Sequence, residues 1–117
     1  MKIIGIDESI GLHNCSENEE VYYIVLKSVY DEGYKKIELM NTAIDTKDYK
    51  AYGIHVHGLK SVALSIGAID LFHMARVQEL AIKEGDILFA LNNNNNFIMK
   101  YKAVLNEISK CKKIMRS

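Results

Sequence analysis

The sequence contains no proline, whereas a chain of average composition carries about 5%. This absence fits a compact chain with few rigid turns. Cysteine is also scarce, since only Cys15 and Cys111 are present and they lie far apart. Two distant cysteines without a signal peptide do not make the disulfide framework of a small secreted domain. We therefore expect reduced thiols and a cytoplasmic protein.

Net charge is absent as well, because 15 acidic residues balance 15 basic ones. No global field would attract a nucleic acid, so we do not expect a nucleic-acid partner. The sequence also lacks a glycine-rich phosphate loop, a G-x-S-x-G elbow and a cysteine nucleophile with a base nearby in sequence. These absences predict a non-catalytic protein that needs no cofactor.

Short runs of β-branched and aromatic residues in the first half predict strands. The expected strands are Lys2–Asp7, Val21–Tyr30, Tyr34–Asn41 and Tyr52–His57. Asp31, Glu32 and Gly33 form a turn between the second and third strands in this interpretation. The polar residues from Ser9 to Glu20 are expected to form a loop, and Asp45 to Tyr49 a loop or a short helical turn.

A long helix is expected from Ser61 to Ile82, and its apolar residues cover nearly the whole helical circumference. Such a helix needs cover on more than one side. The sheet can supply one cover, and another helix of the chain or the same helix of a second copy can supply the other. We favour a homodimer or a higher homo-oligomer. Asp70, His73 and Arg76 interrupt the apolar run and argue against a membrane span.

Beyond Gly85, residues Ile87–Leu91 fit either a helix or a buried strand, and we favour a helix. A final helix is predicted from Phe97 to about Met115, with one asparagine of Asn92–Asn96 as its N-cap. Strands that precede helices indicate an α+β fold with an antiparallel sheet of about four strands, a long buried helix and a C-terminal helix. We expect one domain over residues 1–117, with the sheet in 1–58 and the helices in 59–117.

Asp70, His73 and Arg76 follow one another at intervals of three residues, so each side chain can reach the next along the helix. One interpretation is a structural ion pair with a histidine between its partners. The other is a polar wall inside a ligand pocket, where Arg76 meets an anion.

His55 and His57 would lie on one face of the fourth strand, and His13 with Cys15 makes a second pair of similar spacing. The four side chains could together bind zinc, although the spacing is not that of a known zinc finger or ribbon. The alternative is a strand edge that faces solvent, or a pocket lip that donates hydrogen bonds. The sequence does not tell whether the four residues meet, and we predict no metal site.

The opening residues I-G-I-D-E-S resemble the first strand of RNase H-like nucleases, which ends in a metal-binding carboxylate. Asp7 matches that carboxylate. Two-metal chemistry needs several clustered acids, and Asp45, Asp48 and Asp70 lie in no matching motif. A small metal-dependent nuclease using Asp7 is therefore an alternative function.

The asparagines Asn92–Asn96 precede the predicted final helix. Side-chain amides and free backbone N–H groups at a helix N-terminus bind anions such as phosphate. Phe97 could stack on a base, and Lys100 could reach the same ligand. The alternative is a loop tip without a function.

The order of elements, together with the apolar helix Ser61–Ile82 and the junction Asn92–Phe97, resembles the phage Thoeris anti-defence sponges. The resemblance implies a protein of an infected bacterial cell that sequesters a cyclic ADP-ribose-like nucleotide signal at a homodimer interface without cleaving it. The ligand-binding residues that we predict on this basis are Asn92, Asn93, Asn94, Asn95, Phe97, Lys100, Arg76, His73, Lys60 and His57. The other alternative is a mobile-element inhibitor of a host defence complex, similar to anti-CRISPR proteins.

Overall fold

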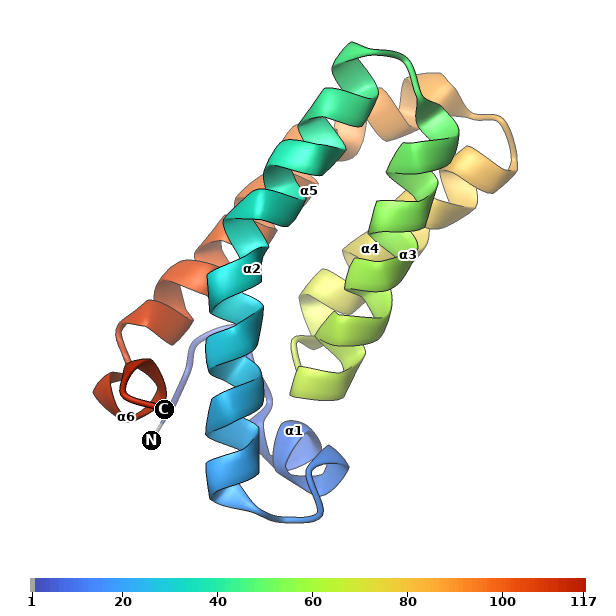
Figure 1. The fold of residues 1–117 in the computed structure, drawn as a ribbon. Helices are drawn as coiled ribbons and strands as arrows, with labels where there is room; N and C mark the ends of the chain where they lie inside the picture. The colour runs from blue at the N-terminus through green and yellow to red at the C-terminus, as the bar shows by residue number, and fades with distance from the viewer. Residues whose placement is uncertain (1) are drawn as a thin grey trace.

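The computed structural model describes residues 2–117, which form six helices (Figure 1). Their bounds are α1 Glu8–Asn14, α2 Glu19–Asp45, α3 Tyr49–Ile66, α4 Ile69–Lys83, α5 Ile87–Ser109 and α6 Lys112–Met115. Helix α3 packs against α2 and α4, and α5 packs against α4 and α2, so these four helices close into a bundle. The molecule is a rod of 40 × 21 × 19 Å.

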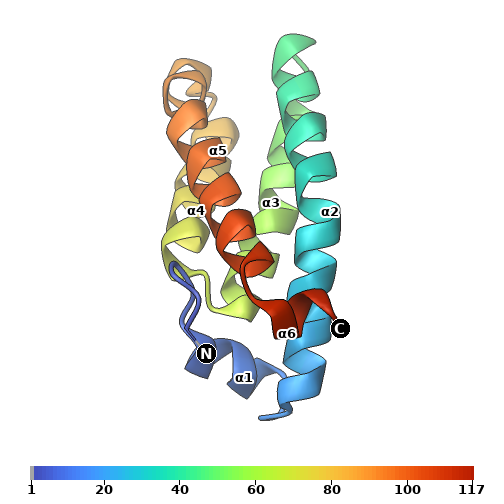
Figure 2. The same ribbon diagram turned by 90° about the vertical axis from the view of Figure 1, so that its left-hand side faces the viewer.

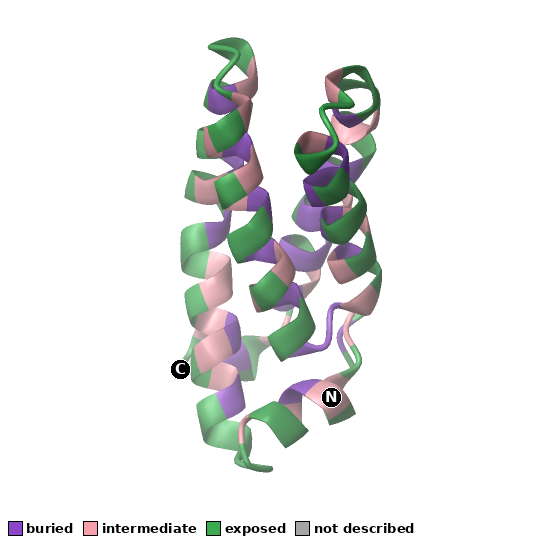
Figure 3. Ribbon diagram, turned by 90° about the vertical axis from the view of Figure 1, so that its right-hand side faces the viewer, coloured by how far each residue is buried: buried purple, intermediate pink, exposed green. Residues whose placement is uncertain are grey.

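The two short helices lie at one end of this bundle, where both chain termini are also found (Figure 2). Helix α1 packs against α2 and α3, and α6 packs against α2 and α5. Buried residues follow the inward faces of the helices, while exposed residues cover the outside (Figure 3). Within residues 2–117, no helix has both the length and the apolarity needed to cross a membrane.

The predicted α+β fold is wrong, because residues 2–117 contain no strand. The predicted strands Val21–Tyr30 and Tyr34–Asn41, and the turn between them, all lie within α2. The buried residues of α2 recur at helical spacing and are Tyr22, Leu26, Gly33, Ile37, Met40 and Ala43. Tyr22 and Ile37, which contributed to the strand-like pattern, are packed on this face, whereas Val21, Ile24 and Tyr34 are exposed. Helical packing thus outweighs the weak local propensity for strands.

Gly33 has a packing role in α2 and does not form a turn. A Cβ atom at this position would lie 2.5 Å from Cδ1 of Leu105. The missing side chain thus lets α5 approach α2 closely. A glycine between two apolar runs fits a hairpin in the sequence pattern, but here it marks a close contact between two helices.

Three more predicted elements of the first half are wrong, whereas the connection expected at Asp45–Tyr49 is confirmed, since α2 ends at Asp45 and α3 begins at Tyr49. Tyr52–His57 belongs to α3, and the predicted loop Ser9–Glu20 contains most of α1 and the start of α2. Lys2–Asp7 is irregular, with a turn closed by the hydrogen bond from Ile6 N to Ile3 O (3.1 Å). The expected division into a sheet at 1–58 and helices at 59–117 therefore has no counterpart.

The predicted helix 61–82 is split in two at Gly67. Gly67 adopts a left-handed conformation (φ 89°) as the C-cap of α3, and Ala68 N donates to Ala63 O at 2.9 Å. Helices α3 and α4 then pack against each other. One side of each helix is thus covered within one chain, whereas Leu64, Val77 and Leu80 stay 45–52% exposed. The homodimer itself stays a prediction.

Gly67→Ala is expected to lower the free energy of unfolding by about 2–4 kcal/mol. An L-residue in the left-handed region costs about 1–2 kcal/mol, and the new Cβ would lie 2.0 Å from the backbone oxygen of Asp7. Urea denaturation measures the loss. Gly85→Ala is the matched control, since φ there is +76° and a new Cβ would meet no atom within 4 Å. Equal losses at the two positions would show that the contact with Asp7 does not matter.

Helix α5 begins ten residues earlier than predicted, at Ile87, where Oδ1 of Asp86 accepts from Phe89 N at 3.2 Å. The helical interpretation of Ile87–Leu91 is confirmed. The predicted helix start at Asn92–Phe97 is wrong, because the asparagines lie inside α5. The C-terminal helix ends at Ser109 and is followed by α6.

Candidate functional site

An exposed histidine on α3 is held by a buried carboxylate of α4. Nδ1 of His57 makes a short hydrogen bond with Oε2 of Glu79, and Nζ of Lys60 donates to Oε1 of the same carboxylate at 2.6 Å. The side chains of His57, Lys60 and Glu79 are 62%, 24% and 9% exposed. One carboxylate thus fixes an imidazole that remains open to solvent.

The positions of these residues follow from helix geometry. His57 and Lys60 are three residues apart on α3, so they lie on one face of that helix. Glu79 enters from α4, which packs against α3. Gly53 allows this close packing, since a Cβ there would lie 3.1 Å from Cγ2 of Ile82 on α4. The contact between α3 and α4 therefore assembles the cluster.

The charge of Glu79 is stabilised by its two partners. Burial alone would raise the pKa of this carboxyl group, but the hydrogen bonds and charges of Lys60 and His57 outweigh that effect and lower the pKa below its usual value of 4.5. Glu79 is therefore ionised at neutral pH and can only accept hydrogen bonds.

The tautomer of His57 follows from this ionisation. Because Glu79 is an acceptor, Nδ1 of His57 must be the donor and carries the proton. In the neutral imidazole the lone pair then resides on Nε2. A carboxylate on Nδ1 also fixes the orientation of the ring. The exposed imidazole is thus prepared to act as a nucleophile through Nε2.

The surface beside His57 is a shallow groove of about 410 Å³. Its lining residues are Lys50, Gly53, Ile54, His57, Glu79, Ile82 and Lys83. The groove combines an apolar wall, to which the 61% exposed side chain of Ile54 belongs, with lysines at its margin. It provides an apolar contact surface for another molecule next to the imidazole.

Gly58, which follows His57, is exposed and has no structural reason to be a glycine. It does not adopt a positive φ, and a Cβ there would meet no atom within 4 Å. A glycine inside a helix nevertheless costs about 0.5–1 kcal/mol relative to alanine. What the missing side chain provides is open surface next to the imidazole.

The stability that Glu79 contributes should depend on pH in a defined direction. A carboxyl group whose pKa is lower in the folded state stabilises the fold above its unfolded pKa, and loses this contribution as the pH falls through the folded value. The difference in free energy of unfolding between the wild type and Glu79→Gln is therefore expected to be full at pH 7 and to shrink below pH 4.5. Urea denaturation between pH 7 and pH 3 measures it, and a difference that grows below pH 4.5 would contradict the assignment.

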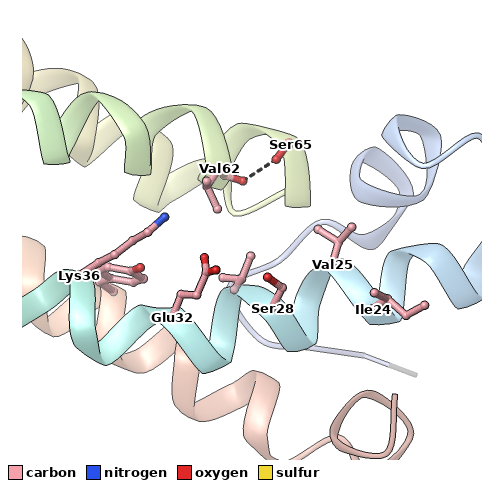
Figure 4. Close-up of a pocket in the computed structure, with 9 residues that line it drawn as sticks. Ile24, Val25, Ser28, Glu32, Lys36, Val62 and Ser65 are labelled. Atoms are coloured by element: carbon pink, nitrogen blue, oxygen red, sulfur yellow. Dashed lines mark hydrogen bonds between the residues drawn. The ribbon is translucent and has the colours of Figure 1, made fainter.

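A second hollow, of about 370 Å³, lies between α2 and α3, and no residue lines both it and the groove at His57. Glu32 and Lys36 extend from α2 toward α3, and the hydroxyl of Ser65 donates to Val62 O at 2.8 Å (Figure 4). Tyr101 of α5 also lines it, and burial together with the charge of Glu32 raises the pKa of Tyr101 to about 12. This hollow contains no arrangement comparable to the held imidazole.

The predicted ligand-binding residues do not form one site. Only His57 and Lys60 meet, through Glu79. In α5, Asn93 donates from Nδ2 to Phe89 O at 2.8 Å, and Asn94 accepts from the hydroxyl of Tyr52 at 2.7 Å. Asn92 and Asn95 are exposed. Because this run lies inside a helix, it offers no free backbone N–H groups to an anion.

Phe97 is 1% exposed and belongs to the core, so its ring is not available to stack on a base. His73 and Arg76 are exposed on α4, and within residues 2–117 no ion pair joins either of them to Asp70. Asp70 instead lies 3.8 Å from Nζ of Lys100. The predicted ion pair along the helix is therefore wrong, and His73 contacts the ring of its neighbour Phe72.

The two histidine pairs do not assemble either. Across residues 2–117, no group of three or more histidine, cysteine or acidic side chains is arranged to hold a metal ion. His13 pairs with Glu17 at 3.5 Å on an exposed turn. Asp7 is the N-cap of α1, where Oδ1 accepts from Ser9 N at 3.1 Å and from Ser9 Oγ at 2.6 Å. The hydrogen bond from the Ser9 hydroxyl is the main cause that lowers the pKa of Asp7.

Glu79 is a site residue that the sequence patterns did not indicate. Its signal lay in the helical interpretation of residues 49–66, which places His57 and Lys60 on one face with an acid on the following helix. No family model, curated protein or solved structure matches this chain.

Proposed function

We propose that this chain is a phosphoryl carrier, a histidine phosphotransfer protein that accepts a phosphoryl group on Nε2 of His57 and passes it on. The observation that carries the proposal is the exposed imidazole whose Nδ1 is held by the buried, ionised Glu79. Histidine is one of the side chains that form covalent intermediates, and a nucleophile of this kind requires an orienting partner on its other nitrogen.

The chemistry uses only groups at this site and on a partner. The lone pair of Nε2 attacks the phosphorus atom in line, a P–N bond forms, and the P–O bond of the donor breaks with its electrons on the leaving oxygen. The ring becomes cationic and keeps its proton on Nδ1, where the negative charge of Glu79 stabilises it. The reverse sequence delivers the phosphoryl group to an acceptor.

The surroundings fit a partner protein as donor and acceptor. The apolar groove with Ile54 and Ile82 offers contact area beside the nucleophile, and Gly58 leaves room for close approach. Lysines at the groove complement an acidic surface. A carboxylate side chain that forms an acyl phosphate suits such an exchange, because it is an established covalent carrier of phosphoryl groups.

Small phosphoryl donors test the proposal directly. The purified chain is incubated with phosphoramidate or acetyl phosphate, and the products are examined by intact-mass spectrometry and ³¹P NMR. We expect one phosphoryl group, labile in acid and stable in alkali, on Nε2 of His57. Absence of modification with both donors, or equal modification of all four histidines, would refute the proposed function.

Gly58→Ala is expected to raise the free energy of unfolding by about 0.5–1 kcal/mol, because alanine favours the helix and fills open space. Phosphoryl uptake from phosphoramidate should stay unchanged, since a methyl group does not block a small donor. Gly53→Ala is the comparison, because its Cβ must displace Ile82 and the gain should be smaller or reversed. A destabilised Gly58→Ala variant would indicate a structural role for this glycine.

The predicted capture of a nucleotide signal, and the resemblance to Thoeris sponges, stay predictions. The helix N-terminus on which the phosphate site depended is not at Asn92–Phe97. The held imidazole therefore has the stronger support.

A further inference from the structure

A buried hydrogen-bond network links the three helices behind the site. Gln78 of α4 is 1% exposed, and its Nε2 donates to the hydroxyl of Tyr52 on α3 and to Ala90 O on α5, both at 2.8 Å. The Tyr52 hydroxyl donates in turn to Oδ1 of Asn94 at 2.7 Å. Burial raises the pKa of Tyr52 to about 12, so this hydroxyl keeps its proton at neutral pH.

Two of the helices that the network joins, α3 and α4, also carry the residues of the candidate phosphoryl site. Gln78 directly precedes Glu79, and successive residues of a helix point about 100° apart. Gln78 thus points into the bundle while Glu79 reaches His57. Tyr52 lies about one and a half turns before His57 on α3. A shift of α4 along α3 would break the hydrogen bond between Gln78 and Tyr52. The same shift would also separate Glu79 from Nδ1 of His57.

The network is not explained by stability alone. Oε1 of Gln78 is buried without a hydrogen-bond partner, an arrangement that costs free energy. An apolar side chain of similar size would avoid that cost. Apolar contacts do not depend strongly on direction, whereas a hydrogen bond fixes one register, as buried polar residues do in coiled coils.

We propose that Gln78 is a positioning residue, which fixes the register of α4 on α3 through Tyr52 and so holds Glu79 against Nδ1 of His57. The inference rests on the proposed function for its consequence in phosphoryl transfer. Its structural content, the orientation and tautomer of His57, can be measured separately.

Gln78→Leu separates positioning from stability. The substitution removes the unpartnered Oε1 and keeps an apolar side chain of similar size, so the melting temperature should match or exceed that of the wild type. ¹⁵N NMR of the imidazole should show a smaller fraction of His57 with the proton on Nδ1. The rate of uptake from phosphoramidate should fall about tenfold, since a small misplacement of a reacting group has effects of this size or larger.

Leu71→Met is the matched control, because Leu71 is a buried residue of α4 outside the network. It should leave the tautomer and the rate unchanged. Tyr52→Phe provides a second test with the ring retained, and it decides the question by the same two readouts if Gln78→Leu does not fold. A tautomer and a rate equal to those of the control would overturn the inference. A changed tautomer in a protein whose wild type takes up no phosphoryl group would refute the proposed function and support the positioning role.

Discussion

His57→Gln is expected to abolish phosphoryl uptake from phosphoramidate while the chain stays folded. The substitution removes the only nitrogen that the cluster presents as a nucleophile, and the amide of glutamine does not replace its lone pair. The side chain is 62% exposed, so the free energy of unfolding should change by less than about 1 kcal/mol. Intact-mass spectrometry measures uptake, and urea denaturation measures stability.

The chain contains its own controls for this result. His55 lies two residues away on α3, so its side chain points about 200° around the helix from His57, and His73 is exposed on α4. Among residues 2–117, no carboxylate forms an ion pair with either of these two histidines. His55→Gln and His73→Gln should therefore take up one phosphoryl group at the wild-type rate. Residual uptake in His57→Gln that disappears with His73→Gln would assign the nucleophile to α4 and contradict the assignment to His57.

Three observations distinguish His57 from a histidine that is merely exposed. Nδ1 is fixed by a carboxylate, that carboxylate is buried and ionised, and the ring lies beside a groove and a glycine. His13 meets only the first condition, since its partner Glu17 is exposed and lies at 3.5 Å. The comparison within one chain shows why burial of the partner matters: a solvated carboxylate holds a ring weakly.

The sequence predicted the helices of the second half better than the elements of the first half. Residues 87–91 were correctly expected to be helical, because the five asparagines that follow them would make an unusually long hairpin tip. In α2, valines and tyrosines gave a strand-like composition over ten residues, while the 3.6-residue spacing of Tyr22, Leu26 and Ile37 became apparent only over 27 residues. A long helix that continues through Gly33 satisfies both patterns.

The site could be predicted in part. His57 and Lys60 were both candidates, but strand geometry paired His57 with His55, since alternate residues share a face in a strand and oppose each other in a helix. Glu79 could not be assigned without the break at Gly67, which reverses the chain and brings α4 back against α3. The asparagines of α5 suggested an anion site, yet Oδ1 of Asn94 accepts a hydrogen bond from the hydroxyl of the buried Tyr52. A polar run can serve packing when its neighbours are buried.

Glu79→Gln is expected to slow phosphoryl uptake about 10- to 100-fold, by analogy with the effect of replacing the hydrogen-bond partner of a metal-binding histidine. Glutamine preserves the shape of the side chain but has no negative charge. It cannot stabilise the cationic ring that forms when Nε2 attacks phosphorus, and it does not require the proton to stay on Nδ1. Rates of uptake at several phosphoramidate concentrations measure the effect, which should fall on the rate at saturation more than on the concentration at half-saturation.

Glu84→Gln is the matched control, since Glu84 is an exposed acid at the C-cap of α4 that makes no hydrogen bond with His57. It removes the same charge and should leave the rate unchanged. A comparable loss in both variants would mean that the rate depends on the total negative charge of the chain, and that it does not depend on the contact between Glu79 and Nδ1. Uptake at the wild-type rate in Glu79→Gln would remove the carboxylate from the mechanism. Because Lys60 donates to Oε1 of the same group, Lys60→Met should produce a smaller loss in the same direction: it frees one oxygen of Glu79 but leaves the hydrogen bond to the imidazole in place.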